Sequence, residues 1–318
     1  MSFASVSFLL FFLVVLLLLL LVQRVLPFAE IKRRIICQGI LLIASYVFYG
    51  WWNMRLCLLL MGITWISFFT AVKKDEKHLR QSRISLLIGV GTPLAVLGIF
   101  KYYDFFVTSF CEVFHLTPGV LNLILPVGIS FYTFQALSYT IDVYTGKIEK
   151  EKSFLQFALY LSFFPQLVAG PIVKASEFLP QLKENRKVTL SGLESGIQIF
   201  VFGMFKKVVL ADNISVFVDE VYRSPQIFGS GTVALAVAAY AIQIYMDFSG
   251  YSDMAIGCAK CMGYELPVNF NLPYISHNVS EFWKRWHISL SSWLMQYLYI
   301  PLGGNCLLYT SPSPRDYA

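Results

Sequence analysis

The sequence predicts an all-helical protein that crosses a membrane several times. Of its 318 residues, 57% are hydrophobic and 14% are charged, whereas charged residues make up about a quarter of an average soluble domain. The first apolar segment, residues 3–22, contains no charge and is long enough to cross the roughly 30 Å hydrocarbon layer of a bilayer. Its first basic residue, Arg24, follows the apolar run, so we expect a retained span and not a cleaved signal peptide.

Basic residues predict how the spans are oriented. The net charge is +6, and Lys and Arg lie mainly in short loops between apolar segments. Loop 23–34 carries four basic residues against one Glu, and loop 73–83 carries five basic residues. Because cytoplasmic loops are enriched in Lys and Arg, we expect both loops inside the cell and the N-terminus outside. The same scattered distribution argues against a nucleic-acid-binding surface, which would gather basic residues on one face.

Further apolar segments continue this pattern along the chain. Residues 84–100 contain Pro93 and three Gly, which predicts a kinked span supported by neighbouring helices. Residues 101–119, with His115, are expected at the outer surface. Other membrane segments are expected at residues 35–49, 56–72, 121–143, 190–210 and 233–246.

Residues 154–172 conflict with a simple spanning helix. Basic residues on both sides, at 147–152 and 174–187, place both ends in the cytoplasm. The interior reads F-F-P-Q-L-V-A-G-P, with two Pro and one Gly. We therefore expect a re-entrant or broken helix that lines a cavity.

The preceding segment is rich in hydroxyl and amide groups. Such side chains do not face lipid, so they are expected to make hydrogen bonds between helices or to line a water-filled cavity. The residues are Ser130, Tyr132, Thr133, Gln135, Ser138 and Tyr139.

Charged residues near two other apolar segments allow several interpretations. Asp247 and Asp253 could act as general acid and base, as a proton relay or as helix caps. Their i, i+6 spacing separates them on a continuous helix, which we expect Gly250 to interrupt. Lys206 and Lys207 are expected to extend towards lipid headgroups.

Residues 281–305 carry the strongest candidate for a site. They read E-F-W-K-R-W-H-I-S-L-S-S-W-L-M-Q-Y-L-Y-I-P-L-G-G-N, with His287 at the start of a long apolar run. A His at the rim of an apolar segment in a membrane protein is a functional hypothesis by default. Cys258 and Cys261 form a C-x-x-C pair without a second pair or a nearby His, so no metal site is predicted.

Five ordered motifs give the chain a family resemblance. They are V-F-Y-G-W-W at 47–52, L-P-V-G-I-S-F-Y-T-F-Q at 125–135, F-F-P-Q-L-V-A-G-P-I at 163–172, Y-M-D-F-S-G-Y-S-D-M-A-I-G at 245–257 and F-W-K-R-W-H-I-S-L-S-S-W from 282. This set resembles the membrane-bound O-acyltransferase (MBOAT) family, in the branch of the bacterial alginate O-acetyltransferase membrane subunits. The D-alanyl transfer proteins of teichoic acid modification are more distant relatives.

The resemblance implies a multi-pass protein of the bacterial inner membrane whose helices ring a central funnel. It implies transfer of an acyl group, most simply acetyl, from an acyl-CoA or acyl-carrier-protein thioester to hydroxyls of an extracytoplasmic polysaccharide such as alginate. No bound cofactor or metal is expected. The expected partners are the acyl donor, membrane lipid and proteins of the polysaccharide pathway, including an extracytoplasmic acyltransferase. The alternatives are an acyl-group conduit or transporter, or a scaffold for such an acyltransferase.

The resemblance makes His287 the first of two active-site histidines. Transfer to a hydroxyl needs a base, and a neutral imidazole suits that role near pH 7. The indole and hydroxyl groups of the same stretch could contact an oxyanion or the acceptor, and its two adjacent cations could attract a phosphate-bearing donor or anchor the helix. The candidate substrate-binding residues are Trp286, Ser289, Trp293, Arg285, Lys284 and Asn269.

The end of the chain departs from the family pattern. The second histidine, expected downstream in a W-H-G context, is absent, since His78, His115 and His277 all precede His287. Residues 306–318 read C-L-L-Y-T-S-P-S-P-R-D-Y-A and resemble the translation of a transposase-type sequencing adapter. We therefore expect residues 1–305 to be a partial membrane domain, residues 306–318 to be non-native, and this fragment to be inactive.

Overall fold

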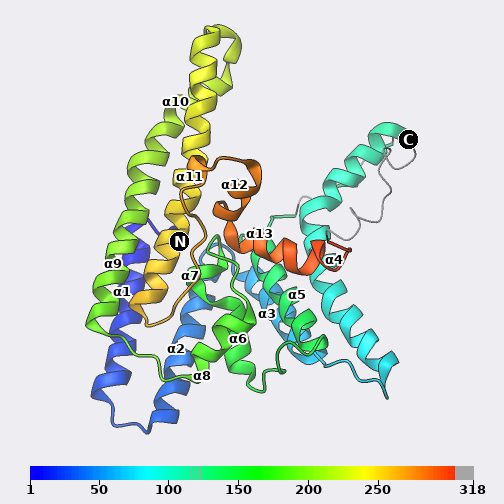
Figure 1. Cartoon of the computed structure of the whole chain (residues 1–318), viewed down its shortest axis with the longest axis vertical. Coiled ribbons are helices and arrows are strands. Elements are labelled where there is room, and N and C mark those ends of the chain that lie inside the picture. Colours follow the sequence, from blue (N-terminus) through cyan, green and yellow to red (C-terminus); the bar gives the residue numbers. More distant parts are fainter. Residues whose placement is uncertain (115, 118, 122, 305–318) are drawn as a thin grey trace, which may run out of the picture. The chain divides into compact units, whose positions relative to one another are not determined.

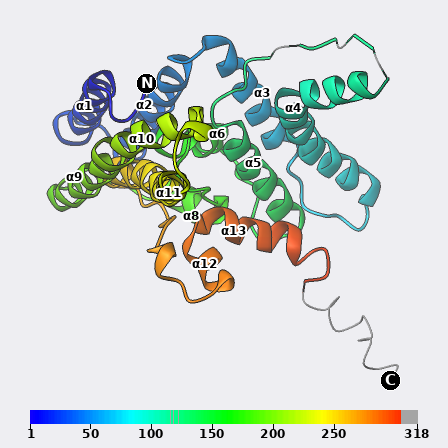
Figure 2. The same cartoon turned by 90° about the horizontal axis from the view of Figure 1, so that it is seen from above.

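The chain folds into helices joined by loops. The computed structural model describes residues 1–114, 116–117, 119–121 and 123–304, and no β-strand occurs among them. The predictions for His115 and for residues 306–318 therefore fall outside the described part. The chain divides into two compact units, Met1–Leu266 and a second unit that begins at Pro267. Figures 1 and 2 show the helices of the first unit from two directions. The predicted all-helical class is confirmed.

Three helices in the described residues are long and apolar enough to cross a membrane. They are α1 (Val6–Leu20) with the π-helical turn Leu21–Val25, α4 (Leu79–Phe114) and α11 (Ser230–Cys261). The remaining early helices are α2 (Glu30–Gly50) and α3 (Met54–Thr70). Ser5 begins α1 because its hydroxyl accepts a hydrogen bond from the backbone N–H of Phe8, at 3.2 Å.

Helix α4 is longer than the span predicted at residues 84–100. It continues to Phe114, with Pro93 inside it, and so includes the first part of the segment 101–119, whose place at the outer surface stays a prediction. The reason lies in residues 101–114, whose many aromatic and β-branched side chains extend the apolar surface of the helix. Phe105, Phe106 and Phe110 are exposed along it, as suits a helix that faces lipid.

Helix α5 (Ile129–Tyr144) begins eight residues later than the predicted span 121–143. Gly128 precedes it in the left-handed conformation, with φ of +76°, and a Cβ there would overlap the backbone carbonyl of Leu167. The polar residues of this segment face protein, as predicted. Five of them are buried, namely Tyr132, Thr133, Gln135, Ser138 and Tyr139, while Ser130 is half-buried.

The segment 154–172 is broken, as its prolines and glycine predicted. It forms α6 (Phe154–Ser162) and α7 (Phe164–Leu167), and α8 (Ala175–Lys183) follows. The backbone N–H of Phe164 donates to the hydroxyl of Ser45 on α2, at 3.1 Å, and the Gln166 amide donates to the carbonyl of Tyr160, at 2.6 Å. Unwound backbone in a membrane domain is tolerated when protein groups satisfy it in this way.

Helices α9 (Leu190–Met204) and α11 lie side by side (Figures 1 and 2). A Cβ on Gly203 would lie 2.6 Å from the carbonyl oxygen of Gly250, and one on Gly257 would lie 2.6 Å from that of Gly196. The prediction that Gly250 interrupts its helix is wrong, because α11 is continuous through it. Gly250 instead allows the two backbones to approach, as small residues do between membrane helices.

A π-helical segment, Phe205–Ala211, links α9 to α10 (Asp212–Arg223) and carries two lysines against α11. Lys206 Nζ lies 2.6 Å from the carboxylate of Asp253, and Lys207 Nζ lies 2.6 Å from that of Asp247. These contacts differ from the predicted extension of both lysines to headgroups. Each acid therefore has a lysine partner, which favours an ion-pair role over acid–base catalysis by the pair.

The second unit is described to residue 304 and contains short helices. They are the 3-10 turn Pro273–Ile275, α12 (Val279–Arg285), α13 (Ile288–Leu294) and the π-helical turn Met295–Tyr299. The stretch predicted to hold the site is thus a pair of short helices that meet at His287.

Candidate active site

Helix α12 is fixed at its start by side-chain caps. The side-chain oxygen of Asn278 accepts from the backbone N–H of Glu281, at 2.8 Å, and the Glu281 carboxylate accepts from the backbone N–H of His277, at 3.0 Å. The guanidinium of Arg285 lies 2.8 Å from the same carboxylate, one turn along. The backbone donor at His277 and the charge of Arg285 lower the pKa of Glu281, so this half-buried carboxyl is ionised at neutral pH.

His287 stands between α12 and α13 in an unusual backbone conformation. Its φ is +43°, in the left-handed region that residues other than Gly seldom occupy. Two backbone hydrogen bonds hold the flanking residues. Ile288 N–H donates to the carbonyl of Asn269, and Asn271 N–H donates to that of Arg285, both at 2.9 Å. The loop 269–271 therefore fixes the turn that presents the imidazole.

The side-chain oxygen of Asn269 is the centre of a buried polar cluster. It lies 3.1 Å from His287 Nδ1, 3.2 Å from the backbone N of Ser289 and 2.9 Å from the Ser289 hydroxyl oxygen. The exposed fractions of Asn269, Ser289 and His287 are 1%, 6% and 9%. Buried polar groups of this kind are positioned rigidly, because moving one would leave its partners without a hydrogen bond.

This cluster assigns the tautomer of His287. The backbone N–H of Ser289 can only donate, so the Asn269 atom that it meets is the amide oxygen, an acceptor. His287 Nδ1 must then carry a proton and donate to the same oxygen, which leaves Nε2 as the unprotonated ring nitrogen. Burial lowers the pKa of His287 to about 4, and the residue lies outside the candidate membrane spans. The imidazole is therefore neutral at pH 7, with the lone pair of a base on Nε2.

One aromatic ring lies beside this imidazole, and two others pack behind that ring. The ring of Phe270 lies nearly parallel to the imidazole, with centroids 6.3 Å apart, and contacts Trp286 edge-on at 5.1 Å. Trp286 also stacks on Phe282, at 5.6 Å. The apolar wall explains why the imidazole favours its uncharged form.

The structure distinguishes the remaining predicted residues. Ser289 gives its only hydroxyl proton to Asn269, so in this conformation it positions the cluster and does not serve as an oxyanion donor. Trp293, further along α13, is buried and packs on Tyr297, with centroids 5.1 Å apart. Lys284 is exposed, whereas Arg285 is engaged with Glu281.

The positioning role of Asn269 was missed from sequence, where it was only a substrate-binding candidate. The available signal was an Asn in a loop rich in Pro and Asn that leads directly to the His. Phe270, its neighbour, was not singled out at all.

Comparisons with known proteins agree with the motifs. The family model of the membrane-bound O-acyltransferases matches residues 147–310. The probable alginate O-acetylase AlgI of Pseudomonas putida is 43% identical over 274 residues, which cover 84% of this chain and 56% of that protein. The peptidoglycan O-acetyltransferase of Helicobacter pylori is 39% identical over 292 residues, 83% of this chain and 55% of the relative.

A more distant relative is the teichoic acid D-alanyltransferase of Streptococcus thermophilus. It is 30% identical over 192 residues, which cover 58% of this chain and 45% of that protein. The chain spans about half the length of the curated relatives it matches.

Proposed function

Because the chain belongs to the membrane-bound O-acyltransferase family, we propose that it is part of an enzyme that acylates a hydroxyl of a cell-surface polysaccharide. The acyl group is acetyl, as the names of the alginate and peptidoglycan relatives suggest. The donor is a cytoplasmic thioester, of coenzyme A or a carrier protein, and the acceptor is outside the inner membrane. The observation that carries this proposal is the buried hydrogen bond from His287 Nδ1 to Asn269, which leaves Nε2 as the nitrogen that can accept a proton.

The proposed reaction uses the neutral and the protonated state of the His287 imidazole. His287 Nε2 removes the proton of the acceptor hydroxyl while the hydroxyl oxygen attacks the thioester carbonyl carbon. The new C–O bond forms as the C–S bond breaks, and the proton on the imidazolium passes to the leaving thiolate. The products are an ester and a free thiol, and His287 returns to its neutral form. Asn269 keeps its acceptor oxygen on Nδ1 throughout and so stabilises the transient charge.

Lys284 supports a donor role better than Arg285 does. Lys284 is exposed and makes no ion pair among the described residues, so it could meet the phosphates of a donor. Arg285 holds Glu281 and the start of α12. Trp286 belongs to the aromatic wall beside the imidazole.

We further propose that the natural protein continues past residue 305 and that residues 306–318 do not belong to it. This proposal rests on the adapter-like reading of that segment and on the greater length of the relatives. Sequencing across the junction tests it, and a genomic stop codon directly after residue 318 would contradict it. Membranes that contain the printed 318-residue chain alone are expected to transfer no acetyl groups above a vector control.

The decisive test uses the natural protein at full length, purified and reconstituted in vesicles without other proteins. With a labelled acetyl thioester and a soluble oligosaccharide, the wild type should form labelled ester. His287→Ala should lower kcat by roughly 10²- to 10⁴-fold, the usual contribution of a general base.

His277→Ala is the matched control, because that residue is exposed and its hydrogen bond to Glu281 comes from the backbone N–H, which the substitution keeps. It should leave kcat unchanged. Transfer that survives His287→Ala would contradict the proposed base. Absence of transfer by the wild type alone, with recovery on adding an extracytoplasmic acyltransferase, would favour a conduit or scaffold.

A further inference from the structure

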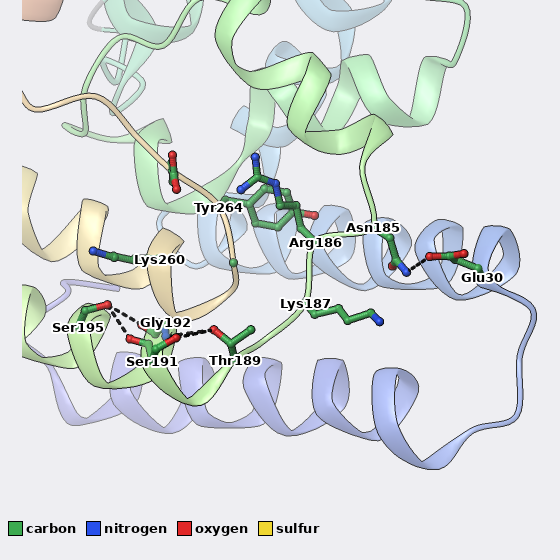
Figure 3. A pocket seen from close by; sticks show the side chains of 12 residues that line it. Glu30, Asn185, Arg186, Lys187, Thr189, Ser191, Gly192, Ser195, Lys260 and Tyr264 are labelled. Atoms are coloured by element: carbon green, nitrogen blue, oxygen red, sulfur yellow. Dashed lines mark hydrogen bonds between the residues drawn. The ribbon is translucent and has the colours of Figure 1, made fainter.

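A polar cavity of about 570 Å³ lies in the first unit, where the start of α9 meets the end of α11 (Figure 3). Three cations line it, namely Arg186, Lys187 and Lys260, together with the Ser and Thr hydroxyls of Thr189, Ser191 and Ser195. Gly192 is needed at this junction, because a Cβ there would lie 3.3 Å from the Lys260 carbonyl and 2.9 Å from the Thr189 hydroxyl.

The charges of this cavity are suited to an anion. Lys187 and Lys260 form no ion pair among the described residues, whereas Arg186 Nε lies 2.8 Å from a carboxylate oxygen of Glu184. Two carboxylates, Glu30 and Glu265, also lie in the wall, and Glu30 accepts a hydrogen bond from Asn185. The two lysines are therefore the cations available to a ligand.

Backbone donors add to these lysines. Helix α9 starts at the cavity, and Thr189 caps it by accepting from the N–H of Gly192, at 3.1 Å. The N–H groups of Leu190 and Ser191 have no acceptor among the described residues. The Ser195 hydroxyl donates to the carbonyl of Ser191, at 2.7 Å, so the hydroxyls of Thr189 and Ser191 are the ones that join these N–H groups as donors for phosphate-type oxygens.

The same segment also lines an apolar groove of about 490 Å³. Val188, Leu190 and Leu193 line it, opposite Leu17 and Leu20 of α1. Successive residues from 187 to 191 thus contribute alternately to the polar cavity and to the groove. Arg24, exposed and without an ion pair in the described part of the chain, lies in the groove wall.

We propose that the cavity and the groove together bind one anionic phospholipid. The headgroup phosphate lies in the polar cavity near Lys187 and Lys260, and an acyl chain lies along the groove against α1. The position fits a lipid, because α1 is a candidate span and the basic loop after it places this end at the cytoplasmic interface. Basic pockets between helices on that side are the usual binding sites of anionic headgroups. The apolar groove favours a lipid over a soluble phosphate.

The test is a titration of the natural full-length protein, in neutral detergent micelles, with fluorescent phosphatidylglycerol and with fluorescent phosphatidylcholine. The wild type should bind phosphatidylglycerol more tightly, and unlabelled glycerol 3-phosphate should not displace it. The double variant K187Q/K260Q should bind about 30-fold more weakly, as expected for two basic residues at a membrane surface. Leu190→Gln, in the exposed wall of the groove, should also weaken binding.

The matched control is K74Q/K77Q, which removes two exposed lysines from another loop predicted to be cytoplasmic. It should bind phosphatidylglycerol like the wild type. Equal wild-type affinities for the two lipids would overturn the proposal, and so would an unchanged affinity in K187Q/K260Q. Displacement of the lipid by glycerol 3-phosphate would also overturn the proposal, because it would show that the cavity binds a soluble phosphate compound. If K187Q/K260Q does not fold, the proposal is still tested by the wild-type affinities for the two lipids and by the affinity of Leu190→Gln for phosphatidylglycerol. Binding is measured without catalysis, so the result is independent of acyl transfer.

Discussion

Replacing Asn269 by Ala removes the acceptor at the centre of the polar cluster. Three hydrogen bonds end on its side-chain oxygen, from His287 Nδ1, Ser289 N and the Ser289 hydroxyl. At about 1 kcal/mol each, their loss should lower the free energy of unfolding by up to about 3 kcal/mol. The bond to Nδ1 also orients the base. Its share, about 1 to 2 kcal/mol added to the barrier, corresponds to a roughly 5- to 30-fold lower kcat.

The assay is acetyl transfer by the reconstituted full-length protein, with kcat and the donor KM measured separately. Asn269→Ala should lower kcat and leave the donor KM nearly unchanged, because Asn269 acts through the imidazole. Asn271→Ala provides the control. It makes the same change two residues away, where the side chain is exposed and the hydrogen bonds are made by the backbone. An Asn269→Ala protein that is folded and retains the wild-type kcat would refute the positioning role.

Asn269→Asp separates this role from a merely structural one. The variant keeps an acceptor oxygen for Nδ1 and adds a negative charge, which raises the pKa of His287. In the wild type, burial lowers that pKa to about 4, so the base is unprotonated above this pH and kcat should fall only as the pH drops towards 4. In Asn269→Asp the loss should begin at a higher pH. Identical pH profiles between pH 4 and 8 would show that Asn269 does not act on the imidazole.

Two further predictions concern packing in the first unit and are read out as thermal unfolding in detergent. Gly257→Ala should destabilise the protein by about 1 to 3 kcal/mol, because its Cβ would lie 2.6 Å from the Gly196 carbonyl oxygen. Gly231→Ala is the control on the same helix, where the new Cβ meets nothing within 4 Å and stability should not fall. Lys206→Met should cost about 1 to 3 kcal/mol by leaving the carboxylate of Asp253 partly buried without its partner, and adding Asp253→Asn should recover part of the loss. Equal melting temperatures for the two glycine variants would contradict the first prediction. The second would be contradicted if the losses of stability from Lys206→Met and Asp253→Asn simply added in the double variant.

The membrane helices could be predicted because apolar length is a local property. The uncharged run at residues 3–22 predicts a span from its own sequence. The two prolines and the glycine at residues 154–172 likewise predict a broken helix. Gly250 shows the limit of this approach. A glycine within a helix can mark an interruption or a close neighbour, and here the neighbour is Gly203, which lies on another helix. The sequence of α11 alone does not contain that information.

The candidate site, like the helices, could be predicted only where the signal is local. His287 was identified from its place at the rim of an apolar run and from the motif around it, and that role remains a prediction. The contact with Asn269 could not be predicted, because the two residues are 18 positions apart and meet through a turn. The left-handed backbone at His287 was equally hidden, since it depends on the hydrogen bonds of loop 269–271.

The glycine contacts between α9 and α11 also limit how the length of the chain can change. Gly196 lies opposite Gly257 and Gly203 opposite Gly250, so the glycines on each helix are seven residues apart and the helices share one antiparallel register. An insertion or deletion of one residue between either pair would rotate the helix by about 100° and place side chains against backbone. Natural variation in length should therefore be excluded from these two stretches and occur in the loop between α10 and α11.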